Sequence, residues 1–145
     1  MTNIDSEVVL VRLRLIAKYR NTLLEEVNSV SLDDYLNDFR QQLIVEKLLQ
    51  LMVEAATDTN RYLLAQLHQI STATYFDSFI EAGRQGIISP ELAAELAKSA
   101  GMRNILVHQY KDIDSRVVFA AISKALEQYP LYTRQITAYI DSLEV

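Results

Sequence analysis

The chain has 145 residues, and half of them are hydrophobic. Its net charge is −5, and it contains no cysteine. This length suits one domain, 1–145, and the apolar content excludes a disordered chain. The lack of cysteine excludes disulfides and thiolate metal sites. The negative net charge disfavours a protein that binds nucleic acid over a wide basic surface, but it permits a small RNA-binding site. No apolar run nears the ~20 residues of a membrane span and the start does not resemble a signal peptide, so we expect a cytoplasmic protein without membrane contact.

Glycine and proline are rare, with three and two copies, and alternating strand patterns are absent, which predicts long helices. A first helix is expected over 6–29, where apolar residues recur every three or four positions. Ser31 then has the character of an N-cap. A second helical region follows to about Gln69, with a possible break near Asn37-Asp38.

Three further helical regions are expected in the second half of the chain. One covers 71–84 and ends at Gly83 and Gly86, since glycine commonly ends helices. The next begins at 89–91, where Ser-Pro-Glu places a capping hydroxyl before a proline, and it runs to about His108.

The last helical region starts near Ser115, after a polar link in which Asp114 is a suitable cap. Pro130 should kink or split this region, because proline has no backbone N–H and its ring clashes with the preceding turn. The sequence therefore predicts an all-α protein, an up-and-down helical bundle of four to five helices.

The most unusual stretch is 103–110, Arg-Asn-Ile-Leu-Val-His-Gln-Tyr, near the end of the fourth helix. At about 100° per residue, Arg103 and Tyr110 fall within the apolar stripe of that helix. Asn104 and His108 lie beside each other but off the stripe. An arginine in an apolar stripe is costly unless its charge meets a partner.

The arginine and the histidine cannot converge on one small target while the helix stays regular. Either the helix unwinds near His108, or two copies of the chain share a site across a symmetric interface, and we favour this homodimer. The plainer interpretation of Arg103 is an ion pair within the chain. The candidate carboxylates lie on the second helical region, at Glu46, Glu54 and Asp58.

Other residues also have plain interpretations. A single histidine at a helix end, such as His108, is more often a cap or packing group than a catalyst, and Tyr110 alone would indicate packing. His68 has no neighbouring ligand types and is expected to be structural. No carboxylate lies close in sequence to either histidine in a ligand-like pattern, so we expect no metal site, and no phosphate-binding glycine loop occurs.

The pattern Arg-x4-His-x-Tyr, late in an acidic all-helical chain, resembles the motif of HEPN ribonuclease toxins of the HepT type. Arg103, His108 and Tyr110 match it. A Glu54-Ala55 pair on a long second helix, a short third helix and an Asp-rich link after the motif also agree. The motif is short, and its place in the order of helices makes it more specific; elsewhere the likeness is one of pattern.

This resemblance implies a metal-independent endoribonuclease that works as a homodimer, needs no cofactor, and is the toxin of a type II-like toxin–antitoxin system. It also implies a protein partner, a minimal nucleotidyltransferase antitoxin that transfers AMP to the motif tyrosine, here Tyr110. The sequence leaves open whether messenger or transfer RNA is the substrate.

The side chains suit such chemistry, because the 2′-hydroxyl of RNA can itself attack the neighbouring phosphate. His108 can take or give a proton near neutral pH, and Arg103 can hold two phosphate oxygens at once. Asn104 would orient the histidine or bind phosphate. Tyr110 would stack on a base or bind phosphate, and AMP on its hydroxyl would repel RNA by charge and volume.

The alternative function is a non-catalytic helical module that binds nucleotide or docks a nucleotidyltransferase. The acidic net charge and sparse basic surface favour it. A purely structural bundle ranks last, because it leaves Arg103 in an apolar stripe without a purpose.

Overall fold

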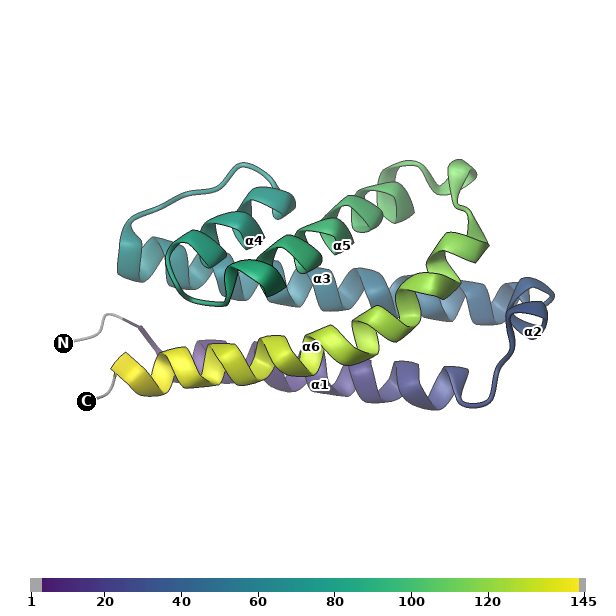
Figure 1. Ribbon diagram of the computed structural model, residues 1–145, viewed down its shortest axis with the longest axis horizontal. Coiled ribbons are helices and arrows are strands. Elements are labelled where there is room, and N and C mark those ends of the chain that lie inside the picture. The colour runs from purple at the N-terminus through teal and green to yellow at the C-terminus, as the bar shows by residue number, and fades with distance from the viewer. Residues whose placement is uncertain (1–3, 144–145) are drawn as a thin grey trace.

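The computed structural model describes residues 4–143, which form helices joined by short loops and contain no strand (Figure 1). These residues form α1 (Ser6–Val27), α2 (Leu32–Leu36), α3 (Phe39–His68), α4 (Tyr75–Arg84), α5 (Pro90–His108), the short 3-10 helix η1 (Tyr110–Asp112) and α6 (Ser115–Leu143). The predicted all-α class is confirmed. No helix in this part of the chain is both long and apolar enough to cross a membrane.

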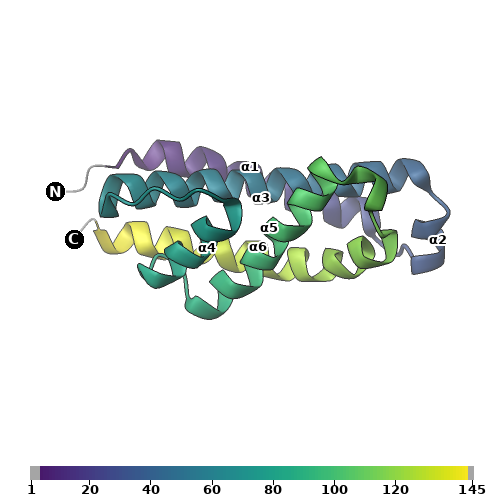
Figure 2. The same cartoon turned by 90° about the horizontal axis from the view of Figure 1, so that it is seen from above.

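The long helices α1, α3 and α6 lie along the length of the molecule, and the α4–α5 pair packs on α3 (Figures 1 and 2). Figure 1 shows the chain running forward along α1, back along α3, forward along α5 and back along α6. This arrangement confirms the up-and-down bundle. The described residues hold six α-helices because the expected break near Asn37-Asp38 separates α2 from α3.

Side-chain caps explain that break. The Ser31 hydroxyl accepts a hydrogen bond from the Asp34 backbone N–H at 3.1 Å, while the Asp34 carboxylate accepts one from the Ser31 backbone N–H at 3.4 Å. Asp38 then caps α3 by accepting from the Gln41 N–H at 3.0 Å. Two N-caps only seven residues apart leave α2 little more than one turn.

The third expected helix has different ends. It starts at Tyr75 rather than at residue 71, because the Thr74 hydroxyl accepts from the Asp77 N–H at 3.0 Å and fixes the first turn. The helix also runs through Gly83 instead of ending there. Gly86 is the glycine that turns the chain, with a φ of 74° that side-chain-bearing residues rarely adopt.

Of the two outcomes expected at Pro130, a kink or a split, the split is wrong, because α6 is one helix from Ser115 to Leu143. Proline at this position removes the hydrogen bond to the carbonyl of Leu126, four residues earlier. Arg20 of α1 replaces it, because its Nε donates to the Leu126 carbonyl at 3.2 Å. A contact from another helix therefore satisfies the carbonyl that the proline leaves free.

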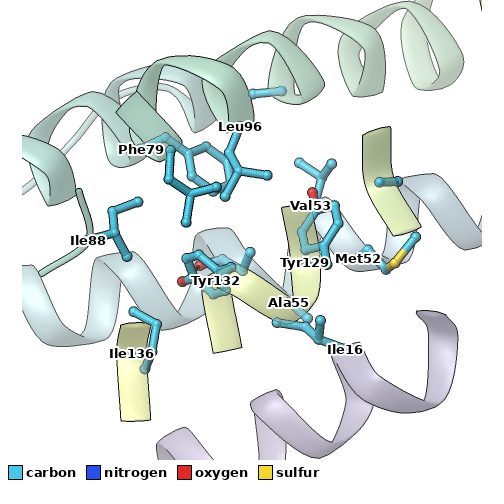
Figure 3. Close-up of a cluster of buried hydrophobic side chains, with 14 of the residues drawn as sticks. Ile16, Met52, Val53, Ala55, Phe79, Ile88, Leu96, Tyr129, Tyr132 and Ile136 are labelled. Carbon is cyan, nitrogen blue, oxygen red and sulfur yellow. Dashed lines mark hydrogen bonds between the residues drawn. The ribbon is translucent and has the colours of Figure 1, made fainter. Parts of the chain in front are cut away.

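Buried hydrophobic side chains from all six α-helices form one core. Figure 3 shows Phe79 and Leu96, from the α4–α5 pair, near Tyr132 of α6. The rings of Phe79 and Tyr132 meet edge to face with centroids 6.3 Å apart. Burial raises the pKa of Tyr132, so its hydroxyl stays protonated and donates to the Asn60 side chain of α3. The core thus fixes the positions of α3, α4 and α5, which carry the candidate site.

Two glycine substitutions should change stability in opposite directions. A Cβ on Gly83 would lie 2.6 Å from the Ala93 Cβ, so Gly83→Ala should lower the free energy of unfolding by about 1–3 kcal/mol through overpacking. A Cβ on Gly101, inside α5, would meet no heavy atom within 4 Å. Gly101→Ala should therefore raise the free energy of unfolding by about 0.5–1 kcal/mol, because alanine has the higher helix propensity. Urea unfolding measures both, and equal stabilities for the two variants would contradict the α4–α5 packing.

Candidate active site

Helix α5 carries the arginine and the histidine of the motif. It begins after Ser89, whose hydroxyl accepts from the Leu92 N–H at 3.2 Å, and it ends at His108, where the Gln109 N–H donates to the Ile105 carbonyl at 2.9 Å. The helix is regular from Arg103 through His108, so it does not unwind near the histidine. The two side chains therefore leave α5 in different directions, as the helical wheel predicts.

Glu54 of α3 holds the guanidinium of Arg103. Nη2 and Nε of Arg103 lie 2.9 and 3.2 Å from the same Glu54 oxygen, Oε2, and Gln50 donates to that oxygen at 3.3 Å. The two charged side chains are mostly buried, with 13% and 28% of their surfaces exposed. Of the three candidate carboxylates, Glu54 is the one that forms this ion pair. The pair offsets the cost of placing an arginine on the packed side of α5.

An aromatic ring completes the surroundings of the arginine. The guanidinium carbon of Arg103 lies 4.2 Å from the ring centroid of Tyr75, at the start of α4, which is a cation–π contact. Arg103 is therefore held by an acid from α3 and a ring from α4. Sequence reasoning missed Tyr75, because no spacing along the chain links it to the motif and it looks like an ordinary apolar position of a short helix.

Asn104 forms a hydrogen bond with the arginine of the motif. Its Oδ1 accepts from Nη1 of Arg103 at 3.4 Å, and its side chain is exposed. His108, one turn further along the same face, is exposed on the last turn of α5. Within one chain, the structure thus brings Arg103 and Asn104 together and leaves the imidazole open to solvent.

Tyr110, the last motif residue, begins the 3-10 helix η1 that follows α5. Its side chain lies outside the described residues. Its neighbours Gln109 and Lys111 are both exposed, so the segment that carries the tyrosine lies at the surface.

A pocket of about 210 Å³ opens between α3, α5 and α6, and Arg103 forms part of its wall. Most of its lining is apolar and includes Leu49, Val53, Met102, Leu106, Val117 and Ala121. Two cations, Lys98 and Lys124, also line it. An apolar lining of this kind suits packing more than phosphate binding.

The other histidine has a structural position. Nε2 of His68 lies 2.9 Å from the hydroxyl of Tyr139, which joins the end of α3 to α6. Among residues 4–143, no three histidine, cysteine, aspartate or glutamate side chains are grouped closely enough to hold a metal ion. The candidate site is thus made of an arginine, an asparagine and a histidine, with a surface segment bearing a tyrosine beyond them.

Comparison with known proteins supplies relatives over the whole chain. A protein named tRNA nuclease HepT, from Aphanizomenon flos-aquae (strain 2012/KM1/D3), is 51% identical over 144 residues, which cover 99% of this chain and 97% of the relative. A protein named mRNA nuclease HepT, from Shewanella oneidensis, is 28% identical over 104 residues, covering 72% of this chain and 78% of that protein.

A similar fold occurs in a solved structure of the tri-AMPylated Shewanella oneidensis HEPN toxin in complex with the MNT antitoxin. The TM-score is 0.83 with 24% identity, covering 90% of this chain and 97% of that one. Residues 13–136 match the family model described as Ribonuclease HepT-like. These residues include α3, α4 and α5, from which the candidate site is built. The chain therefore belongs to the HepT-like ribonuclease family.

Proposed function

We propose that this chain is the toxin of a toxin–antitoxin pair and cuts RNA as a metal-independent endoribonuclease. All of 1–145 acts as one domain, in the cytoplasm. The observation that carries the proposal is a fixed arginine, Arg103, followed about one and a half turns later on the same helix by an exposed histidine, His108. The name of the 51% identical relative favours transfer RNA over messenger RNA as the substrate.

The reaction needs no nucleophile from the protein. The 2′-oxygen of one ribose attacks the adjacent phosphorus, the bond from phosphorus to the next 5′-oxygen breaks, and the products end in a 2′,3′-cyclic phosphate and a 5′-hydroxyl. Arg103 stabilises the negative charge that builds on the phosphate oxygens. The ion pair with Glu54 orients the guanidinium in advance and leaves Nη1 directed toward the exposed Asn104, where it can donate to an incoming phosphate instead.

Two proton transfers accompany this displacement, one from the 2′-hydroxyl and one to the departing 5′-oxygen. One imidazole cannot stand at both oxygens at the same moment. A homodimer supplies two copies of His108, one as base and one as acid. The exposure of His108 at the end of α5 supports this, because the ring is free to meet a second copy.

The ion pair also favours the alternative of a non-catalytic module that docks a nucleotidyltransferase. Glu54 accounts for the buried charge of Arg103 without any ligand. Activity of purified protein separates the two functions.

Arg103→Ala and His108→Ala should each reduce cleavage at least 100-fold. The measurement uses purified protein with transfer RNA, and separately messenger RNA, in EDTA, with gel analysis of the products and of their cyclic phosphate ends. Arg103→Lys keeps a cation against Glu54 but loses the planar fork, so its low activity would reflect chemistry rather than folding.

The matched controls are His68→Gln and Arg134→Ala, which change a structural histidine and an exposed arginine of α6. Both should cut RNA at the parental rate. Parental rates for Arg103→Ala and His108→Ala would remove the proposed site, and inactivity of the parent itself would favour the docking module.

The shared site requires a dimer. Sedimentation velocity at micromolar concentration should give about twice the chain mass of 16.5 kDa. A monomer that still cleaves RNA would eliminate the two-histidine mechanism while leaving the ribonuclease activity in place.

A nucleotidyltransferase antitoxin is the proposed partner, and it attaches AMP from ATP to the hydroxyl of Tyr110 with release of pyrophosphate. The bulky anion would then repel RNA from the neighbouring arginine and histidine. Protein made together with the transferase should gain the mass of one or more AMP groups at Tyr110 and lose activity. Tyr110→Phe should gain no AMP at this position, and unmodified parent protein from the co-expression would contradict the proposal.

A further inference from the structure

A second arginine lies at the ring that holds Arg103. The guanidinium carbon of Arg61, on α3, is 5.0 Å from the centroid of Tyr75, and that of Arg103 is 4.2 Å from the same centroid. The two cations are therefore about 9 Å apart at most, comparable with the Debye length of about 8 Å at physiological salt. Their repulsion is only partly screened.

The two arginines differ in how their charge is met. Arg103 has the carboxylate of Glu54. None of the ion pairs among the described residues includes Arg61, and its Nε is buried without a hydrogen-bond partner. Asp58, one turn earlier on α3, and Asp77, on the first turn of α4, are exposed and make no ion pair with it. The site thus holds two cations and one anion, and the half-buried guanidinium of Arg61 contacts the ring of Tyr75 but has no carboxylate partner in the described part of the chain.

Position along the helices separates Arg61 from the reacting end of the site. Arg61 lies seven residues after Glu54, about 10 Å further along α3, whereas His108 lies five residues after Arg103, about 7.5 Å further along α5. The helices α3 and α5 run in opposite directions (Figure 1). Arg61 and His108 are therefore on opposite sides of the Arg103–Glu54 pair.

We propose that Arg61 is a positioning residue for RNA, which binds a backbone phosphate next to the one held by Arg103, on the side away from His108. This inference rests on the proposed ribonuclease function. A phosphate at Arg61 supplies the missing anion and relieves the repulsion across Tyr75. The planar guanidinium can bind phosphate oxygens while it stacks on the ring, which a lysine does less well.

The test is the salt dependence of RNA binding, measured in the His108→Ala background so that the RNA stays intact. A short fluorescein-labelled single-stranded RNA is titrated by anisotropy between about 50 and 200 mM salt. Arg61→Gln should weaken binding about tenfold and reduce the slope of log affinity against log salt by about 0.7, the value for one phosphate contact on a single strand. In the active protein the same change should raise KM more than it lowers kcat.

Arg134→Gln, an exposed arginine of α6 next to α1, is the matched control and should keep both the affinity and the slope. Arg61→Lys should restore most of the slope, because it keeps the charge. Should Arg61→Gln lower the urea midpoint, Arg61→Met, whose stem fills similar space, takes its place. A purely structural role for Arg61 would leave the salt slope unchanged.

The outcomes separate this inference from the function on which it rests. If the active protein cuts RNA, and the Arg61→Gln and Arg61→Met proteins both bind RNA with the parental slope, Arg61 has no role in positioning. If the parent neither binds nor cuts RNA, the ribonuclease proposal fails first, and the role of Arg61 fails with it.

Discussion

The ion pair between Arg103 and Glu54 is the constraint on which the candidate site depends. A guanidinium on the packed side of α5 is tolerated because a carboxylate from α3 and the ring of Tyr75 from α4 meet it there. Three helices must keep their relative positions for these contacts to exist together. The hydrophobic core packs all three, and the Tyr132–Asn60 hydrogen bond ties α3 to α6 through residues distant in the chain.

This arrangement gives the arginine and the histidine opposite physical characters. Arg103 is mostly buried and already oriented, so it would lose little conformational entropy on binding the phosphate of the proposed reaction. His108 is exposed at a helix end, where its ring is free to adopt the positions that the proposed proton transfer would require. In the proposed reaction, electrostatic stabilisation benefits from a fixed group, whereas each of the two imidazoles of a homodimer must approach one oxygen of the RNA. One regular helix provides both by ending directly after the histidine.

Local signals along the chain were enough to predict most of the fold. The caps at Ser31 and Ser89 depend on residues three positions away, so the sequence shows them directly. The motif residues were predicted in the same way, and the separate directions of Arg103 and His108 follow from helical geometry alone. The sequence also narrowed the partner of Arg103 to three carboxylates, all on the helix that supplies it.

Contacts between distant segments could not be predicted. Choosing Glu54 among the three acids needed the packing of α5 on α3, and nothing in the sequence indicated that Tyr75 would lie over two arginines. The continuity of α6 through Pro130 was missed for the same reason. Proline breaks a helix by local rules, and the group that compensates for it comes from the other end of the chain.

The hydrogen bond from Arg20 to the Leu126 carbonyl couples the residue at position 20 to the residue at position 130. Without a donor from α1, a proline at 130 would leave that carbonyl without this hydrogen bond. Conversely, any other residue at 130 has a backbone N–H that can donate to the Leu126 carbonyl, so a donor at position 20 would no longer be needed. Introducing the donor on α1 before the proline would therefore avoid an intermediate in which the Leu126 carbonyl has lost its hydrogen bond.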